Sequence, residues 1–299
     1  MGAVLGGCGE DKLKKEAREK PSLREVLRKA ELPPLSGNGQ MKRGENASGA
    51  SLPDLEELSL KHSEFPEESA ELPDFTAIRN VERKKQRFFE FMGSLLRAEN
   101  MRIRRERYLL LRHFRSFQRG EPLSQRDTKW LRSLCEKYRE SFGDGPDPEL
   151  FRNLLLKVDI IPVQLGVAQA ANESAWGTSR FAWVGNNLFG QWCFEKGCGL
   201  VPIRRSPGST HEVKTYPSPL LSVRDYMNNL NSHPAYREFR VFRYKQRRSR
   251  SGLKPRKLAR GLLDYSAIGQ EYVHRLQNIM QQYAEYRKQA EEETGSKRG

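Results

Sequence analysis

The stretch that decides the fold runs from Pro162 to Trp192 and reads PVQLGVAQAANESAWGTSRFAWVGNNLFGQW. Proline suits the first position of a helix, so Pro162 predicts a helix start. Small and apolar residues then recur at near-helical spacing along one narrow stripe: Leu165, Ala168, Ala171 (or Asn172) and Ala175. Small side chains let a helix lie deep against its neighbours. The segment therefore predicts a buried helix, followed by a loop rich in Asn, Gly and aromatic residues.

This helix carries one carboxylate, Glu173. Helical spacing places it on the same face as Gln169 and Trp176. A carboxyl group in such surroundings should be partly desolvated, which raises its pKa, and a raised pKa suits a general acid near neutral pH. A surface or helix-capping role is the commoner fate of a glutamate, so both interpretations stay open on this evidence alone.

A longer pattern surrounds Glu173. The residues A-x-A-A-x-E-S-x-W-G-x-S, from Ala168 to Ser179, are followed by N-N-L-F-G at 186–190. This pattern resembles the acid motif of the bacterial β-N-acetylglucosaminidases of glycoside hydrolase family 73, which include FlgJ and the autolysins. The chain is most similar to the Bax-type proteins of Gram-negative bacteria, and the resemblance extends more weakly over 72–286. It implies Glu173 as the catalytic acid and peptidoglycan as the substrate.

Two further catalytic candidates come from the resemblance. Glu212, in a Thr-x-Glu of the segment after the helix, matches the position of a second glutamate that activates water or stabilises positive charge. A cross-strand ion pair is its structural alternative. Glu195 is a weaker competitor, and Asp225 is explained as a helix cap. Tyr265 matches a cleft tyrosine that orients water or the substrate's acetamido group, although the Thr and Asp of that motif are missing.

A saccharide site needs exposed aromatic rings flanked by amides. Trp176, Asn187, Phe189 and Trp192 are the candidates for substrate binding. The run Asn187 to Gly190 also suits a structural turn that fixes the wall of the cleft. We therefore favour Trp192 over Phe189 as a direct contact.

The composition bounds the domain organisation. The chain has 299 residues, 36% of them hydrophobic and 30% charged, with 16 prolines. Apolar residues cluster after Phe75, which predicts one core of roughly 200 residues. We expect a largely disordered extension at 1–74 with a linker at 36–51, a helical part at 75–145, a glucosaminidase domain at 146–290 and a disordered tail at 291–299. No apolar run reaches the length of a membrane span.

Helical stripes dominate the chain outside one segment. They begin near Asn80 and recur after Ser124, after Asp147 with Pro148, and after Ser222 with Asp225. The segment from Cys193 to Tyr216 is rich in Gly, Pro, Thr and Val and predicts a small β-hairpin lobe. The predicted fold is mainly α (α+β): a lysozyme-like helical domain with this lobe after the helix of Glu173.

The cysteines bear on the compartment. Cys193 and Cys198 frame a turn-forming loop, where a disulfide could staple the hairpin in an oxidising compartment, and a zinc pair is the alternative. Cys8 follows Leu-Gly-Gly and resembles the lipidated cysteine of bacterial lipoproteins, but the residues before it lack the length of a signal. The resemblance implies the periplasm or cell envelope, with a lipoprotein anchor or a chance match at Cys8 as alternatives.

A formal charge of +15 suits an anionic partner. No nucleic-acid motif accompanies it, so we expect acidic wall polymer and a monomeric protein. The scattered histidines form no metal-ligand pattern, and no metal or cofactor is expected. The leading hypothesis is an endo-β-N-acetylglucosaminidase. The alternatives are a lytic transglycosylase and a non-catalytic wall-binding protein.

Overall fold

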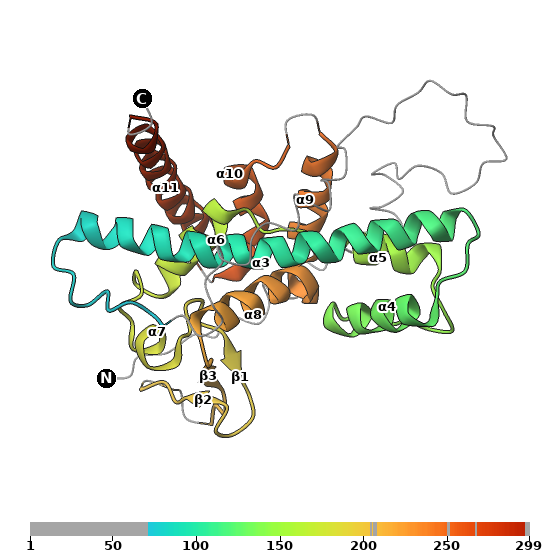
Figure 1. Ribbon diagram of the computed structural model, residues 1–299. Helices are drawn as coiled ribbons and strands as arrows, with labels where there is room; N and C mark the ends of the chain where they lie inside the picture. Colours follow the sequence, from blue (N-terminus) through green and yellow to red (C-terminus); the bar gives the residue numbers. More distant parts are fainter. Residues whose placement is uncertain (1–70, 204, 206–207, 250–251, 267, 297–299) are drawn as a thin grey trace, which may run out of the picture. The chain divides into compact units, whose positions relative to one another are not determined.

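The computed structural model describes residues 71–203, 205, 208–249, 252–266 and 268–296 (Figure 1). The chain divides into two units, Met1–Ala47 and Ser48–Gly299, and every described residue belongs to the second. Cys8 and the expected linker at 36–51 lie outside the described residues.

The longest early helix is α3 (Val81–Gln118), with 38 residues. Asn80 caps it, because its side chain accepts a hydrogen bond from the backbone N–H of Arg83 at 2.9 Å. The helix predicted from this position is confirmed. Its core face consists of large apolar residues that are fully buried: Phe88, Met92, Leu95, Leu96 and Leu110.

Two shorter helices follow with the predicted caps. In α4 (Gln125–Lys137), the Ser124 hydroxyl accepts from the Asp127 N–H at 3.1 Å. In α5 (Pro148–Lys157), Asp147 accepts from the Leu150 N–H at 2.7 Å, and Pro148 occupies the first turn. Both starts were read from the residue types alone, because a capping side chain and a proline satisfy local backbone requirements.

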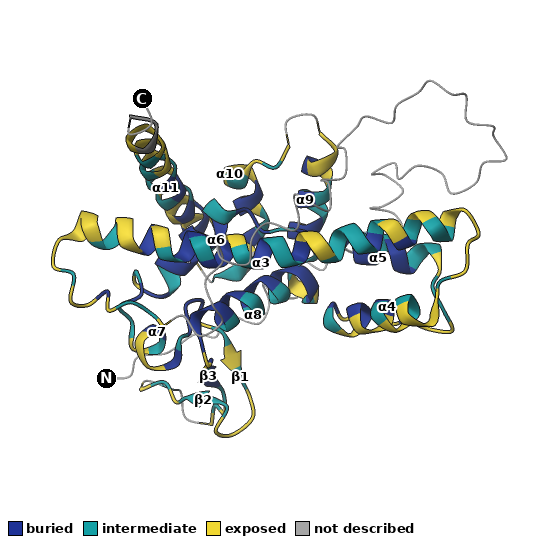
Figure 2. Cartoon of the chain, in the orientation of Figure 1, coloured by how far each residue is buried: buried dark blue, intermediate teal, exposed yellow. Residues whose placement is uncertain are grey.

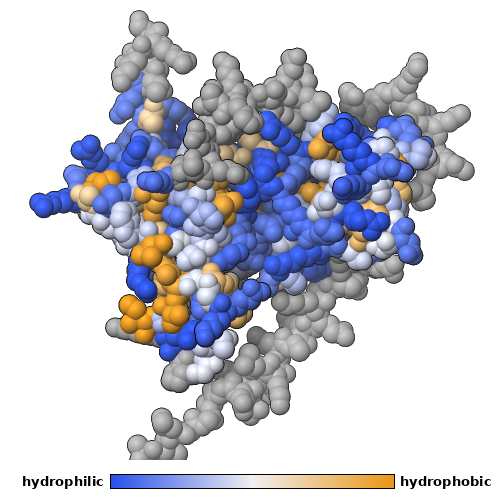
Figure 3. Space-filling view, turned by 60° about the horizontal axis from the view of Figure 1, so that its bottom comes forward, coloured by the Kyte–Doolittle hydropathy of each residue, from blue (hydrophilic) through white to orange (hydrophobic). Residues whose placement is uncertain are grey.

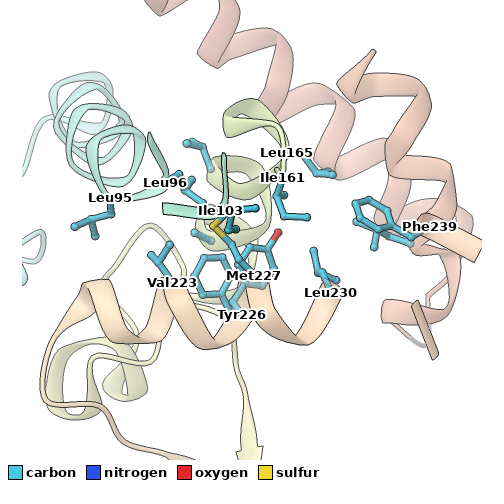
Figure 4. Packing of buried hydrophobic residues seen from close by; sticks show 14 of the residues in the cluster. Leu95, Leu96, Ile103, Ile161, Leu165, Val223, Tyr226, Met227, Leu230 and Phe239 are labelled. Atoms are coloured by element: carbon cyan, nitrogen blue, oxygen red, sulfur yellow. The ribbon is translucent and has the colours of Figure 1, made fainter. Parts of the chain in front are cut away.

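The helix of the deciding stretch is α6 (Val163–Glu173), which packs mainly against α3 and α11 (Gln270–Ser296). All seven residues from Leu165 to Ala171 are buried. A Cβ atom on Gly166 would lie 2.6 Å from Cδ2 of Leu96, so the approach to α3 requires glycine. Figure 4 shows Leu96, Ile161 and Leu165 within the same apolar cluster as side chains of α8 (Pro219–Ser232).

The β lobe lies between α7 (Arg180–Gly185) and α8 (Figure 1). Its strands are β1 (Trp192–Cys193), β2 (Gly199–Leu200) and β3 (Glu212–Lys214), which form one antiparallel sheet in the order β1-β3-β2. Val213 of the central strand pairs with Trp192 on one side and Leu200 on the other. The predicted hairpin lobe is therefore present as a three-stranded sheet.

The start of α8 differs from the expected one. Pro219 occupies its first turn and Ser218 its N-cap, so Ser222 and Asp225 lie inside the helix. Asp225 is not a capping residue: it pairs with Lys214 Nζ at 2.7 Å and accepts from the Tyr216 hydroxyl at 2.6 Å. Proline at the first helical position outweighed the capping-box pattern, since its fixed φ favours helix initiation.

The C-terminal part is helical throughout its regular elements, which are η2 (Pro234–Tyr236), α9 (Arg237–Arg248), α10 (Pro255–Leu258), η3 (Ala259–Tyr265) and α11. Helix α11 extends to Ser296, past the expected end of the domain at 290. Toward its C-terminal end it becomes largely exposed (Figure 2).

Part of the basic sequence is structural. Arg243 of α9 is fully buried, and its guanidinium donates to the carbonyls of Leu156 and Asp159 and to Asn231 Oδ1 at 2.6 Å. The Asp159 carboxylate is also buried and accepts hydrogen bonds from Arg247. These hydrogen bonds connect α9 to the end of α5 and to the loop between α5 and α6. The amino-acid composition alone cannot show that these arginines have a structural role.

The predicted fold class, mainly helical with a small β lobe after the helix of Glu173, is confirmed. Within the part of the chain that the structure describes, no helix is both long and apolar enough to cross a membrane.

Candidate active site

Glu173 is the last residue of α6, and the chain turns sharply after it. Ala175, Trp176 and Gly177 have positive φ angles of 50°, 60° and 78°. Trp176 therefore does not share a helical face with Glu173, because the helix has ended. Its ring packs edge-on against Phe88 and Phe89 of α3 at centroid distances of 5.7 and 5.4 Å. Trp176 thus anchors the turn to the core.

The Glu173 carboxyl group is half-buried, and this burial raises its pKa above the ordinary value of a glutamate. Two hydrogen bonds oppose the shift, because they stabilise the carboxylate. The Tyr272 hydroxyl donates one, and Asn172 Nδ2 donates the other to Oε1 at 3.2 Å. A carboxyl group with a raised pKa and reach to solvent can give up a proton to a bound substrate.

A buried hydrogen-bond relay orients Tyr272. The Tyr226 hydroxyl donates to Gln169 Oε1 at 2.6 Å, and Gln169 Nε2 donates to the Tyr272 oxygen at 3.0 Å. Gln169 is fully buried. Since Tyr272 accepts from Gln169, its own proton is free for Glu173. The relay joins α8, α6 and α11 at the carboxyl group.

Sequence reasoning did not assign Tyr226 or Tyr272 to the site. Both lie on apolar helical stripes and both are 1% exposed, so the pattern identified them as core residues. The one signal was the position of Gln169, one turn before Glu173. A buried glutamine needs polar partners, and the hydroxyl groups of tyrosines on otherwise apolar stripes are among the candidates.

Tyr265 lies beside the relay. Its ring stacks on that of Tyr272 at 5.5 Å, and its hydroxyl donates to the Phe189 carbonyl at 3.3 Å. Burial raises its pKa well above the ordinary value, and the charge of Glu173 adds to the shift. The same two causes, in the same order, raise the pKa of the half-buried Tyr236. Neutral phenols therefore surround the acid.

The loop of Asn187 to Gly190 forms a wall next to the carboxylate. Gly190 has φ +66°, and a Cβ atom there would lie 3.9 Å from Glu173 Oε2. Asn187 fixes the turn, donating to the carbonyls of Gln191 and Lys214 at 2.9 and 2.8 Å. The ring of Phe189 stacks on that of Tyr226, with 3.7 Å between the ring centroids. Asn187 and Phe189 are both buried, so they hold the wall in position but do not themselves face a bound substrate.

Glu212 lies in β3 and is held by the tip of the hairpin. Its carboxylate accepts from the backbone N–H groups of Gly197 (3.1 Å) and Gly199 (2.9 Å). These bonds lower its pKa, and the charge of Arg205 contributes less. Glu212 is therefore ionised at neutral pH. The hydrogen bonds that hold it come from the hairpin backbone rather than from a cross-strand lysine or arginine.

A disulfide between Cys193 and Cys198 closes this hairpin. Both sulfurs lie with a Glu212 oxygen in a group whose ligand atoms are within 4.8 Å of one another. Because the sulfurs are bonded to each other, they are not available as zinc thiolates. The disulfide constrains the conformation of the loop whose N–H groups donate to Glu212.

Residues 148–285 match the glucosaminidase family, described as mannosyl-glycoprotein endo-beta-N-acetylglucosaminidase. The chain is also 29% identical over 212 residues to Protein bax of Escherichia coli (strain K12), covering 71% of this chain and 74% of that protein. The chain therefore contains a glucosaminidase domain and is similar to Protein bax over most of its length. No solved structure matches it.

The matched region of the glucosaminidase domain starts at α5, so α3 and α4 precede it. It contains Glu173, Glu212 and Tyr265 as well as the relay of Gln169, Tyr226 and Tyr272. Yet α3 packs directly on α6. The helix that carries Glu173 therefore packs in part against a helix outside the matched region.

The β lobe of the glucosaminidase domain exposes aromatic and aliphatic side chains. Trp192 is 58% exposed and stacks on His211 at a centroid distance of 4.2 Å. Hydrophobic residues gather on part of the face seen in Figure 3. The exposed large apolar residues of α7 and the β lobe are Trp183, Val184, Trp192, Phe194, Val201 and Ile203. Such surfaces commonly mark contact sites.

Proposed function

We propose that this protein is a peptidoglycan hydrolase, an endo-β-N-acetylglucosaminidase that cleaves the β-1,4 bond after N-acetylglucosamine. The observation that carries the proposal is the half-buried Glu173 carboxyl group, whose pKa is raised and whose position is fixed by the Tyr272 hydroxyl. It lies within a segment that matches a family of endo-β-N-acetylglucosaminidases.

Glu173 serves as the general acid. It donates its proton to the glycosidic oxygen as the bond to the anomeric carbon breaks, so that the leaving sugar departs as a neutral alcohol. The carboxylate that remains accepts hydrogen bonds from Tyr272 and Asn172. These bonds stabilise the charge that develops on Glu173 during proton transfer, which lowers the barrier.

Glu212 contributes a fixed negative charge. Its carboxylate already accepts hairpin N–H groups, and its lowered pKa makes it a weak proton acceptor. This favours electrostatic stabilisation of the positively charged transition state over abstraction of a proton from water. The Tyr265 hydroxyl donates to the Phe189 carbonyl, and its proposed role is to position the loop that lines the site beside the substrate.

The exposed ring of Trp192 supports a sugar contact, because its position on β1 leaves an apolar face available for the C–H face of a pyranose. Asn187 and Phe189 contribute indirectly, because they fix the conformation of the loop beside Glu173. Trp176 also contributes indirectly, because its packing on α3 fixes the turn after Glu173. The excess of positive charge favours the approach of a wall polymer that carries peptide carboxylates.

A lytic transglycosylase is the second candidate. It uses a single catalytic glutamate, and the commitment of Glu212 to backbone N–H groups favours such a mechanism. The two reactions differ in product mass, because a transglycosylase forms an anhydro-sugar that is lighter than the hydrolytic product by one water. Mass spectrometry of the fragments from purified peptidoglycan distinguishes them, and the sugar at the new end identifies the bond.

The deciding experiment compares Glu173→Gln with Glu195→Gln, a change at an exposed glutamate of the hairpin. We expect Glu173→Gln to keep wall binding and to lose turnover by at least about 100-fold. Glu195→Gln should behave like the unchanged protein. Unchanged lysis by Glu173→Gln would remove this residue from the mechanism. Wall binding without turnover in the unchanged protein would identify a non-catalytic wall-binding protein instead.

We also propose that the protein acts as a monomer in the periplasm or cell envelope. The Cys193–Cys198 disulfide supports an oxidising compartment. A lipid anchor at Cys8 remains a proposal, which mass analysis of the protein purified from membranes would test.

A further inference from the structure

A concave site lies away from Glu173. It is a cavity of about 540 Å³ next to α10, which in turn packs on α6 and α9 (Figure 1). Its lining combines residues of α6, α10, η3 and α11 and of the segment before α10: Gln164, Leu253, Lys254, Pro255, Arg256, Lys257, Arg260 and Gln277. Four of these are cationic and none is acidic.

The cations of the cavity have no acidic partner among the described side chains. In the part of the chain whose side chains the structure describes, Lys254, Lys257 and Arg260 form no ion pair, and Arg256 donates instead to the neutral Gln281 Oε1 at 3.1 Å. Like charges held around one cavity repel each other, and an anion bound among them relieves that repulsion. This differs from the buried Arg243 of α9, whose guanidinium donates to the Asp159 carbonyl and to Asn231 Oδ1.

The lining also includes Gln164, which lies in the first turn of α6. The N-cap of α6 is Pro162, which offers no side-chain hydrogen bond to the free N–H groups of that turn. A helix N-terminus adds partial positive charge to the cavity. Gln164 lies nine residues before Glu173, so the two ends of α6 are separated by about 14 Å along its axis. The cavity is therefore distinct from the acid's surroundings.

We propose that this cavity binds a phosphate group. A phosphate offers several oxygens to converging donors, and guanidinium groups match its geometry, while lysine supplies a point charge. The volume exceeds that of a free phosphate ion, so a phosphate within a lipid headgroup also fits. The proposal stands on the cavity and its charges, and it does not depend on the function proposed for Glu173.

The test uses the full chain and a double variant, Lys257→Gln with Arg260→Gln, whose side chains are exposed. Calorimetric titration with inorganic phosphate measures the free ion. Sedimentation with phosphatidylglycerol vesicles measures binding to an anionic phosphate headgroup, and vesicles of zwitterionic phosphatidylcholine alone serve as the comparison. We expect saturable binding in at least one phosphate arm, weakened about tenfold or more by the double variant, because each charged hydrogen bond contributes substantially.

A matched control removes two positive charges elsewhere. Arg126→Gln with Lys129→Gln changes exposed residues of α4, outside the cavity lining. We expect this control to retain phosphate affinity within about twofold, and circular dichroism to show both variants folded. Equal losses in both double variants would overturn the proposal, since the binding would then reflect net charge alone.

Two further results would also overturn it. One is the absence of saturable binding in every arm. The other is acetate binding as tightly as phosphate, which would assign the cavity to carboxylates. Cleavage of soluble wall fragments serves as the readout of the separate function: we expect it to be unchanged in the cavity variant, whether or not Glu173 proves catalytic.

Discussion

The Tyr272 hydroxyl donates a hydrogen bond to the Glu173 carboxylate, joining the start of α11 to the end of α6. Burial and this hydrogen bond act on the acid in opposite directions. Burial, the larger effect, raises the pKa of Glu173, and the hydrogen bond limits the rise. Burial therefore favours the protonated form of Glu173, and the hydrogen bond lowers the cost of forming its carboxylate.

Removing this hydrogen bond should shift the pH dependence of the reaction. In Tyr272→Phe the carboxylate loses a stabilising donor, so the pKa of Glu173 rises further. Because the general acid must be protonated, the alkaline limb of the profile of kcat/KM follows that pKa and should move to higher pH. We expect kcat at the optimum to fall about tenfold, through loss of one hydrogen bond to a developing charge.

Tyr286→Phe is the matched control, because it removes a tyrosine–glutamate hydrogen bond to Glu90 at another position of α11. Its pH profile should coincide with that of the unchanged protein. An alkaline limb that stays in place in Tyr272→Phe would show that Glu173 does not set it.

The raised pKa of Glu173 also has a consequence for stability. A folded-state pKa above the unfolded value means that the folded protein loses stability as pH rises through the unfolded and then the folded pKa. Glu173→Gln carries no charge at any pH. It should therefore raise the free energy of unfolding at neutral pH by about 1 kcal/mol, or roughly 2–4 °C in Tm.

This gain should vanish below about pH 4, where the glutamate is protonated in both the folded and the unfolded protein. Calorimetric scans at neutral and acidic pH measure both values. A neutral-pH Tm at or below that of the unchanged protein would argue that the carboxylate is not destabilised by burial.

Local patterns predicted much of the fold. The caps at Ser124 and Asp147 were predictable because a side chain and a backbone N–H three residues later determine each one. The start of α3 near Asn80 was predicted from its apolar stripe, and the structure adds the cap. The end of α6 was not. The turn at Trp176 depends on packing against Phe88 and Phe89 of a distant helix, and helical spacing alone extended the face too far.

The site was predictable in part for the same reason. A sequence motif marked Glu173, but Tyr226 and Tyr272 reach Gln169 only through the packing of α8 and α11 on α6. Their hydroxyl groups are invisible to a pattern that counts them as apolar. Similarly, sequence cannot show the carbonyl groups that surround the guanidinium of Arg243.

The disulfide predicts an effect of reduction on the β lobe. Cys193 and Cys198 close a short loop, and removal of the bond by Cys193→Ser with Cys198→Ser should cost about 2 kcal/mol of stability through the entropy of that loop. The N–H groups of Gly197 and Gly199 would then hold Glu212 less firmly, so its pKa should rise toward the ordinary value.

Thermal scans with and without reductant measure this loss, and turnover on wall fragments measures its effect on the site. Cys135→Ser controls for removal of a thiol, since that cysteine is free and buried. Identical Tm values in oxidised and reduced protein would show that the hairpin holds its shape through the strands alone.

The buried cluster around Asp159 should govern stability in acid. Arg107, Arg243 and Arg247 outweigh the cost of burying this carboxylate and hold its pKa below its ordinary value. Its contribution is therefore complete above the unfolded pKa and is lost as pH falls through the lower folded pKa. Asp159→Asn leaves the fully buried Arg243 and two partly exposed arginines without their carboxylate and should destabilise the protein by about 3–5 kcal/mol at neutral pH.

Denaturant unfolding at neutral and acidic pH tests this expectation, with Asp144→Asn in the exposed turn before α5 as the control for removal of one acidic charge. The destabilisation should shrink toward pH 2, where the carboxylate of the unchanged protein begins to protonate as well. A deficit of the same size at both pH values would mean that Asp159 stabilises the fold through its backbone-directed hydrogen bonds and packing. The charge of the carboxylate would then contribute little, because charge is the only property of Asp159 that disappears in acid.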